Sequence, residues 1–218
     1  MKYGESAFDI LYLLTALTAG IWLLRRRKDR GVWLMGWAVL ILGAGDAFHL
    51  VPRVLNYFLP GDFAAALGIG KLVTSITMTV FYVLMYAIYR QGYRVREKSP
   101  VGGLVLLLAA VRIILCLLPQ NAWLSNEGSV LWGVIRNVPF VLIGALIVGL
   151  FFGRRGEVPA LRHVWLLVTL SFLFYIPVAT AASLVPLLGM LMLPKTVCYI
   201  LLIVSFCRYA RTVEPTEP

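Results

Sequence analysis

The sequence predicts an all-α integral membrane protein with seven transmembrane helices. Hydrophobic residues make up 61% of the 218 residues and charged residues only 14%, so a water-soluble fold could not bury the apolar surface. Apolar stretches of roughly 20 residues, long enough to span a bilayer, recur along the whole chain. They fall at 8–24, 32–52, 67–89, 101–118, 130–152, 163–184 and 187–207. We therefore expect one membrane domain over 1–211 and a disordered polar tail over 212–218.

The first three segments end close to charged residues. Segment 8–24 has Glu5 and Asp9 at its start and is followed by RRRKD, with no small-residue cleavage site. We interpret it as a retained helix, not as a signal peptide. Segment 32–52 ends at Pro52, which removes the backbone hydrogen bond to the carbonyl of residue 48 and favours a kink of the helix at His49. Segment 67–89 is followed directly by a basic run.

The last four segments are equally apolar, and three of them contain a proline beside a polar residue. Segment 101–118 has no internal proline. In the others, Pro139 follows Arg136 by about one turn, Pro177 lies just past Tyr175, and Pro194 precedes Lys195. Helix breaks beside polar residues are one way in which membrane helices form cavities.

The positive charges predict the orientation of the chain in the membrane. The cations that follow alternate helix ends are Arg25, Arg26, Arg27, Lys28, Arg30, Arg90, Arg94, Arg96, Lys98, Arg154, Arg155, Arg162, Arg208 and Arg211. All of them fall on one side of a seven-helix arrangement, so the positive-inside rule places the N-terminus outside and the C-terminus in the cytoplasm. We expect the plasma membrane. This placement accounts for the net charge of +10 without a nucleic-acid partner.

Two parts of the chain resemble each other. RGVWLMGW, from Arg30, aligns with RHVWLL, from Arg162, and two segments end in glycine, apolar residues and arginines, as GIWLLRRR and GLFFGRR. The alignment predicts two parallel halves, at about 1–90 and 130–211, linked by a helix at about 101–118. This 3+1+3 layout is similar to that of SWEET-type sugar transporters and microbial rhodopsins.

Three polar residues, Asp46, His49 and Arg53, lie within an otherwise apolar helix. At 100° per residue they fall within about 60° of arc, so their side chains share one face. At about 1.5 Å rise per residue, Asp46 lies roughly 21–24 Å from the basic end of its helix, in the outer third of the membrane. An ionisable group at such a depth is unfavourable in lipid, so this face is expected to point into the bundle.

Other helices place polar groups at similar depths, which indicates a charged cavity in the outer half. Five cations, Arg53, Lys71, Arg112, Arg136 and Lys195, face one embedded acid, Asp46. We expect an ion pair of Asp46 with Lys195 or Arg112, and a small or lipid-borne anionic ligand that the protein transports or binds. The candidate ligand-binding residues are Asp46, His49, Arg53, Lys71, Ser75, Arg112, Arg136, Asn137, Tyr175 and Lys195.

Two alternatives remain open, a membrane-embedded lipid hydrolase or transferase and a seven-helix receptor or sensor. In a hydrolase, His49 would activate Ser75 or Thr74 while Asp46 orients the imidazole. The run from Gly45 to His49 resembles a small-x-x-Phe-His run of alkaline ceramidases and progestin-receptor-like proteins, but their paired C-terminal histidines are absent here. Asp46 and His49 alone are too few for a zinc site, so no metal and no other cofactor is expected.

Overall fold

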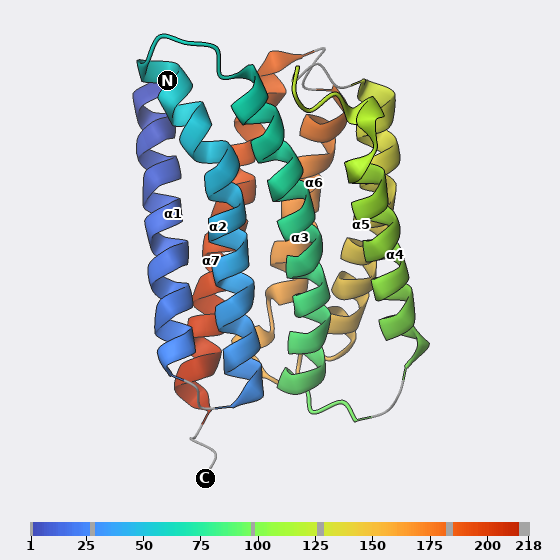
Figure 1. The fold of residues 1–218 in the computed structure, drawn as a ribbon. Coiled ribbons are helices and arrows are strands. Elements are labelled where there is room, and N and C mark those ends of the chain that lie inside the picture. Colours follow the sequence, from blue (N-terminus) through green and yellow to red (C-terminus); the bar gives the residue numbers. More distant parts are fainter. Residues whose placement is uncertain (1, 27–28, 97–98, 126–128, 182–184, 214–218) are drawn as a thin grey trace.

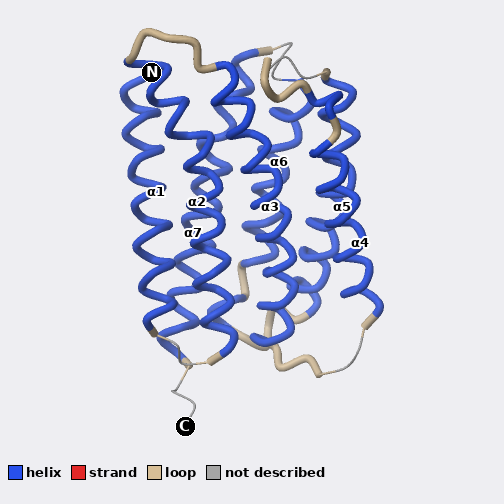
Figure 2. Tube along the Cα trace, in the orientation of Figure 1, coloured by secondary structure: helices blue, strands red, loops and turns tan. Residues whose placement is uncertain are grey.

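A computed structural model of the chain describes residues 2–26, 29–96, 99–125, 129–181 and 185–213. In this part of the chain seven helical segments are long and apolar enough to cross a membrane, as predicted. The α-helices are α1 (Lys2–Arg25), α2 (Arg30–Phe58), α3 (Ala64–Gly92), α4 (Pro100–Leu117), α5 (Val130–Gly153), α6 (Val164–Ala181) and α7 (Met192–Thr212). Short 3₁₀ helices, η1 (Pro119–Asn121), η2 (Pro159–Leu161) and η3 (Pro186–Leu191), precede α5, α6 and α7. Figure 2 shows helices joined by short loops.

Several helices extend beyond their predicted ends because polar residues continue them outside the apolar stretch. The Asp29 carboxylate caps α2 by accepting a hydrogen bond from the Val32 amide at 2.6 Å. At its other end α2 passes through Pro52 to Phe58, where the sequence predicted an end at residue 52. There Arg53 binds Glu5 of α1, so a polar interhelical contact holds the last turns. The predicted polar tail falls mainly on residues 214–218, which lie outside the described residues.

The helices form a ring in chain order, which α7 closes by packing between α1 and α6 (Figure 1). α4 lies on the ring between α3 and α5, and α3 also contacts α5. Glycines bring α2 and α3 close together, because a Cβ atom on Gly70 would lie only 2.7 Å from the Cα atom of His49. This contact fixes the position of His49. The 3+1+3 repeat stays a prediction.

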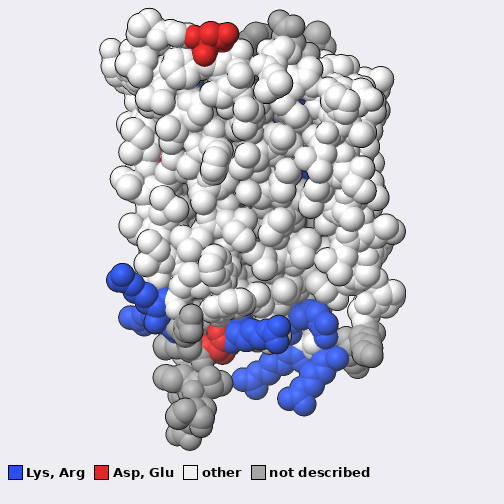
Figure 3. All heavy atoms as spheres, viewed as in Figure 1, with Lys and Arg blue, Asp and Glu red and all other residues white. Residues whose placement is uncertain are grey.

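The exposed charges on the face seen in Figure 3 gather at the two ends of the bundle and leave the middle uncharged. We call the end where α1 stops at Arg25 and α7 at Thr212 the basic end, and the end where α1 starts at Lys2 the N-terminal end. The lower, basic end carries most of the Lys and Arg side chains on this face. Of the cations that predicted this bias, Arg27, Lys28 and Lys98 lie outside the described residues.

Candidate functional site

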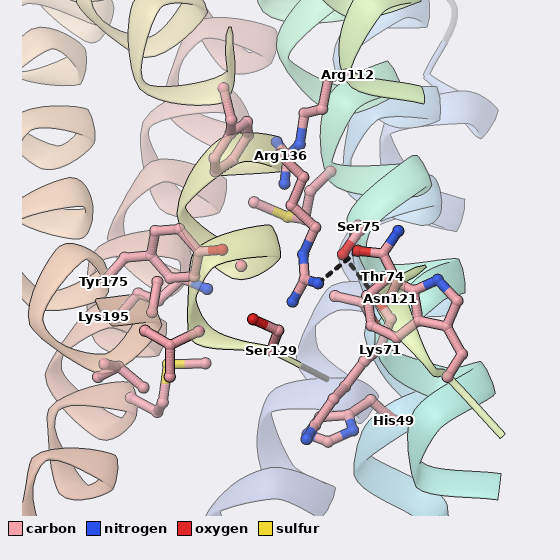
Figure 4. Close-up of a pocket in the computed structure, with 18 residues that line it drawn as sticks. His49, Lys71, Thr74, Ser75, Arg112, Asn121, Ser129, Arg136, Tyr175 and Lys195 are labelled. Atoms are coloured by element: carbon pink, nitrogen blue, oxygen red, sulfur yellow. Dashed lines mark hydrogen bonds between the residues drawn. The ribbon is translucent and has the colours of Figure 1, made fainter. Parts of the chain in front are cut away.

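A cavity of about 480 Å³, which we call the main cavity, lies near the N-terminal end and is lined by α3, α5, α6, α7 and the connection that follows α4, with one residue each from α2 and α4. It is lined by Lys71 and Ser129 close to the helix starts, and it reaches Phe140, about 15 Å below the start of α5. Its polar lining, labelled in Figure 4, consists of His49, Lys71, Thr74, Ser75, Arg112, Asn121, Ser129, Arg136, Tyr175 and Lys195. No carboxylate among the described residues lines it.

Arg112 of α4 is the most deeply buried charged group of the site, with 2% of its surface exposed. Its guanidinium carbon lies 3.3 Å from the centroid of the Phe140 ring, so the aromatic face supports the cation. Two guanidinium nitrogens, Nε and Nη1, are buried and have no hydrogen-bond partner. Buried donors are nearly always satisfied in proteins, so two unpartnered nitrogens on one buried cation are unusual.

Arg136 of α5 is held in place by the connection that follows α4. Its Nη1 donates a hydrogen bond to Asn121 Oδ1 at 2.7 Å, and its guanidinium lies 4.5 Å from the Trp123 ring centroid. The Asn121 amide in turn donates to the carbonyl of Leu115 at 2.8 Å, and Trp123 Nε1 donates to the carbonyl of Cys116 at 2.8 Å. This connection is therefore a fixed wall of the cavity.

The turn that forms this wall depends on an unusual backbone conformation. Ala122 adopts the left-handed conformation, with φ 48° and ψ 44°, between the two residues that support Arg136. A single alanine gives no sequence signal for this conformation. For that reason sequence reasoning missed Asn121 and Trp123 as residues of the site.

Lys195 of α7 lies over an aromatic face on the opposite side of the cavity. Its Nζ is 4.7 Å from the Tyr175 ring centroid and 5.7 Å from that of Tyr199. The Tyr175 hydroxyl donates to Asn137 Oδ1 at 2.8 Å, and the Asn137 amide donates to the Gly133 carbonyl at 2.8 Å. Asn137 thus lies behind Tyr175 and positions it, and it does not line the cavity.

A second, smaller cavity of about 70 Å³ adjoins the first and is lined by acidic residues. Glu5 and Asp9 of α1 line it together with Asp46 and Arg53 of α2. Asp9 is 5% exposed and its Oδ2 atom has no hydrogen-bond partner. His49, Thr74, Met192 and Lys195 line both cavities, so they form the boundary between a basic and an acidic compartment.

The acidic compartment changes the predicted charge balance. The expectation of one embedded acid was wrong, because Glu5 and Asp9 lie beside Asp46. Arg53 is 3.0 Å from Glu5, so it is paired with an acid of α1.

Asp46 also has a different direct partner from the one expected. Its Oδ2 atom accepts a hydrogen bond from the Tyr12 hydroxyl at 2.6 Å. Within the described residues no cation lies within 4.0 Å of its carboxylate, although Lys195 is in electrostatic range. The expected direct ion pair with Lys195 or Arg112 is therefore absent.

The structure brings most predicted site residues together but separates them into two groups. His49, Lys71, Ser75, Arg112, Arg136, Tyr175 and Lys195 line the main cavity, and Asp46 and Arg53 line only the small one. The hydrogen bonds of the hydrolase alternative are not formed: Ser75 donates to the Lys71 carbonyl at 2.7 Å, and His49 Nδ1 has no partner.

No protein-family model, no curated protein and no solved structure matches the chain.

Proposed function

We propose that this multi-pass membrane protein binds an anionic ligand, small or lipid-borne, in the main cavity and serves as its carrier. Arg112 carries the proposal, since it is a buried cation with two unpartnered guanidinium nitrogens, and it lines a cavity that no described carboxylate lines. An anion would supply the missing hydrogen-bond acceptors and neutralise the charge in the same step.

The division of charges between the two cavities supports the choice of an anion. Glu5 pairs with Arg53, and Asp46 lies in the range of Lys195 on the acidic side. Arg112 and Lys195 are within electrostatic range of each other and both line the main cavity, so two like charges repel each other there. Mutual repulsion of this kind is relieved by a bound counter-charge.

We further propose that the N-terminal end faces the outside of the plasma membrane, because the basic end carries the cations expected at the cytoplasm. The main cavity would then take its ligand from the outer side. Cysteines introduced at Ser125 and at Gly92 test the orientation with a membrane-impermeant thiol reagent on intact cells. Ser125 should be labelled, and Gly92 only after the membrane is permeabilised. Labelling of both from the same side would contradict the proposal.

Binding can be tested by thermal unfolding of the purified protein in phosphatidylcholine nanodiscs with added anions. Phosphate, sulfate and acetate salts are compared with chloride at equal ionic strength, because a ligand that binds only the folded protein raises the unfolding temperature. At least one anion should stabilise the wild type and not the Arg112→Gln variant. The control is Arg155→Gln at the basic end, which should keep the response.

Two outcomes of this experiment would overturn the proposed function. One is that no anion stabilises the wild type. The other is that an anion stabilises Arg112→Gln as strongly as it stabilises the wild type, since the bound anion would then not use Arg112.

A further inference from the structure

The main cavity offers several cations to one ligand, and aromatic rings hold three of them in position. Arg112 lies against Phe140, Arg136 against Trp123 and Lys195 against Tyr175. An aromatic face stabilises a cation without neutralising its formal charge or using its in-plane hydrogen-bond donors. The cations therefore remain able to bind an anion.

The three cations come from three different helices, so they approach the cavity from separate directions. α4 contributes Arg112, α5 contributes Arg136 and α7 contributes Lys195. Figure 4 shows Arg112 and Arg136 on one side of the cavity and Lys195 across from them. A planar carboxylate has two oxygens in one plane and one negative charge. It therefore matches the two parallel donors of one arginine better than it matches three cations that approach from separate directions.

A phosphate monoester suits several cations at once. At neutral pH it carries a charge of about −1.5 to −2 and three terminal oxygens that are strong hydrogen-bond acceptors. These oxygens point in different directions, so one arginine can take two of them while a second cation contacts the third.

The remainder of the cavity indicates that the phosphate belongs to a larger molecule. A volume of about 480 Å³ is in the range of sites for small organic ligands. Apolar side chains, among them Met78, Val130, Val178 and Met192, line much of it. An organic group would contact these side chains while the phosphate lies against the cations.

We propose that the main cavity binds a phosphate monoester dianion, with the phosphate held by Arg112, Arg136 and Lys195 and the organic group lying along the apolar wall. This inference rests on the proposed function and names the class of its ligand. The monoester can reach the site from two sources, as a water-soluble alkyl or glycerol phosphate or as a lipid with a phosphate monoester headgroup.

The first experiment compares ligands of equal chain length and different head. Hexyl phosphate, hexyl sulfate and hexanoate are titrated onto the protein in phosphatidylcholine nanodiscs by calorimetry. Hexyl phosphate should bind at least about tenfold more tightly than the other two, because only it combines a second negative charge with three acceptor oxygens.

A variant tests whether the arginine fork makes this preference. Arg112→Lys keeps the positive charge but loses bidentate binding, so it should remove most of the preference for the phosphate. Arg155→Lys, at the basic end, should leave it unchanged. The ligand comparison on the wild type decides the question by itself if Arg112→Lys does not fold.

A second experiment distinguishes the two sources. Nanodiscs with phosphatidic acid, a monoester lipid, are compared with nanodiscs with phosphatidylglycerol, a diester lipid of one charge, by native mass spectrometry of the retained lipid. Selective retention of phosphatidic acid indicates the lipid source. Binding of glycerol phosphate or hexyl phosphate without such retention indicates the soluble source. Either result supports the inference.

Two results would overturn the inference, and they have different consequences. Equal or tighter binding of hexyl sulfate or hexanoate, lost in Arg112→Lys, would refute the phosphate class and leave the anion site standing. No binding of any of the three, together with no selective lipid retention, would refute both the inference and the proposed function.

Discussion

Arg112→Met is expected to stabilise the ligand-free protein, although it replaces one of the most deeply buried side chains of the bundle. A buried charge with unpartnered donors is unfavourable, while a methionine of similar length fills the same space with apolar atoms. Most substitutions of a buried structural residue destabilise a protein. A stabilising effect of Arg112→Met would therefore indicate that Arg112 belongs to a ligand site.

The magnitude follows from two opposing contributions. An arginine near the membrane centre costs about 2.5–3.5 kcal/mol on insertion scales, and here two donors lack partners. The contact with Phe140 at 3.3 Å stabilises the Arg112 cation by about 2 kcal/mol, and the variant loses this contribution. The difference is a stabilisation of about 1 kcal/mol, which corresponds to a rise in unfolding temperature of about 2–4 °C for a chain of this size.

Thermal unfolding in detergent, followed with a dye that fluoresces on reaction with thiols, measures this shift. Cys198 is buried, so it reacts when the bundle opens. Hexyl phosphate should raise the unfolding temperature of the wild type and leave that of Arg112→Met unchanged. A fall in the unfolding temperature of the variant by several degrees without ligand would refute the reasoning, because it would make Arg112 a structural residue.

Three further substitutions test the surroundings of the site by the same assay. Tyr12→Phe should destabilise the protein by about 1–3 kcal/mol, because Asp46 loses its direct donor; an unchanged unfolding temperature would contradict this. Gly70→Ala should lower stability by about 1–3 kcal/mol or more through overpacking of α2 against α3, whereas Gly103→Ala, with open space around it, should be neutral or stabilising. Arg53→Ala should cost about 1–2 kcal/mol and keep the anion response, since Arg53 lines only the small cavity; loss of that response would show that the two cavities act together.

Local features of the sequence were sufficient to predict the seven membrane helices and one polar face. Apolar composition is a property of each segment alone, so hydropathy located every span. The helical period placed Asp46, His49 and Arg53 on one face, and the structure confirms that all three line the small cavity. Helix lengths were less accurate, because capping and interhelical ion pairs extend helices beyond their apolar stretch.

Only the tertiary structure decided how the polar residues divide into two cavities. That division depends on the rotation of each helix about its axis, which contacts such as Gly70 against α2 determine and which no local pattern contains. The carboxylates of Glu5 and Asp9 belong to the site because α1 packs against α2, and the turn at Ala122 brings Asn121 to Arg136. The burial of a side chain and its hydrogen-bond partners depend on the contacts between helices, so they follow only from the packed bundle.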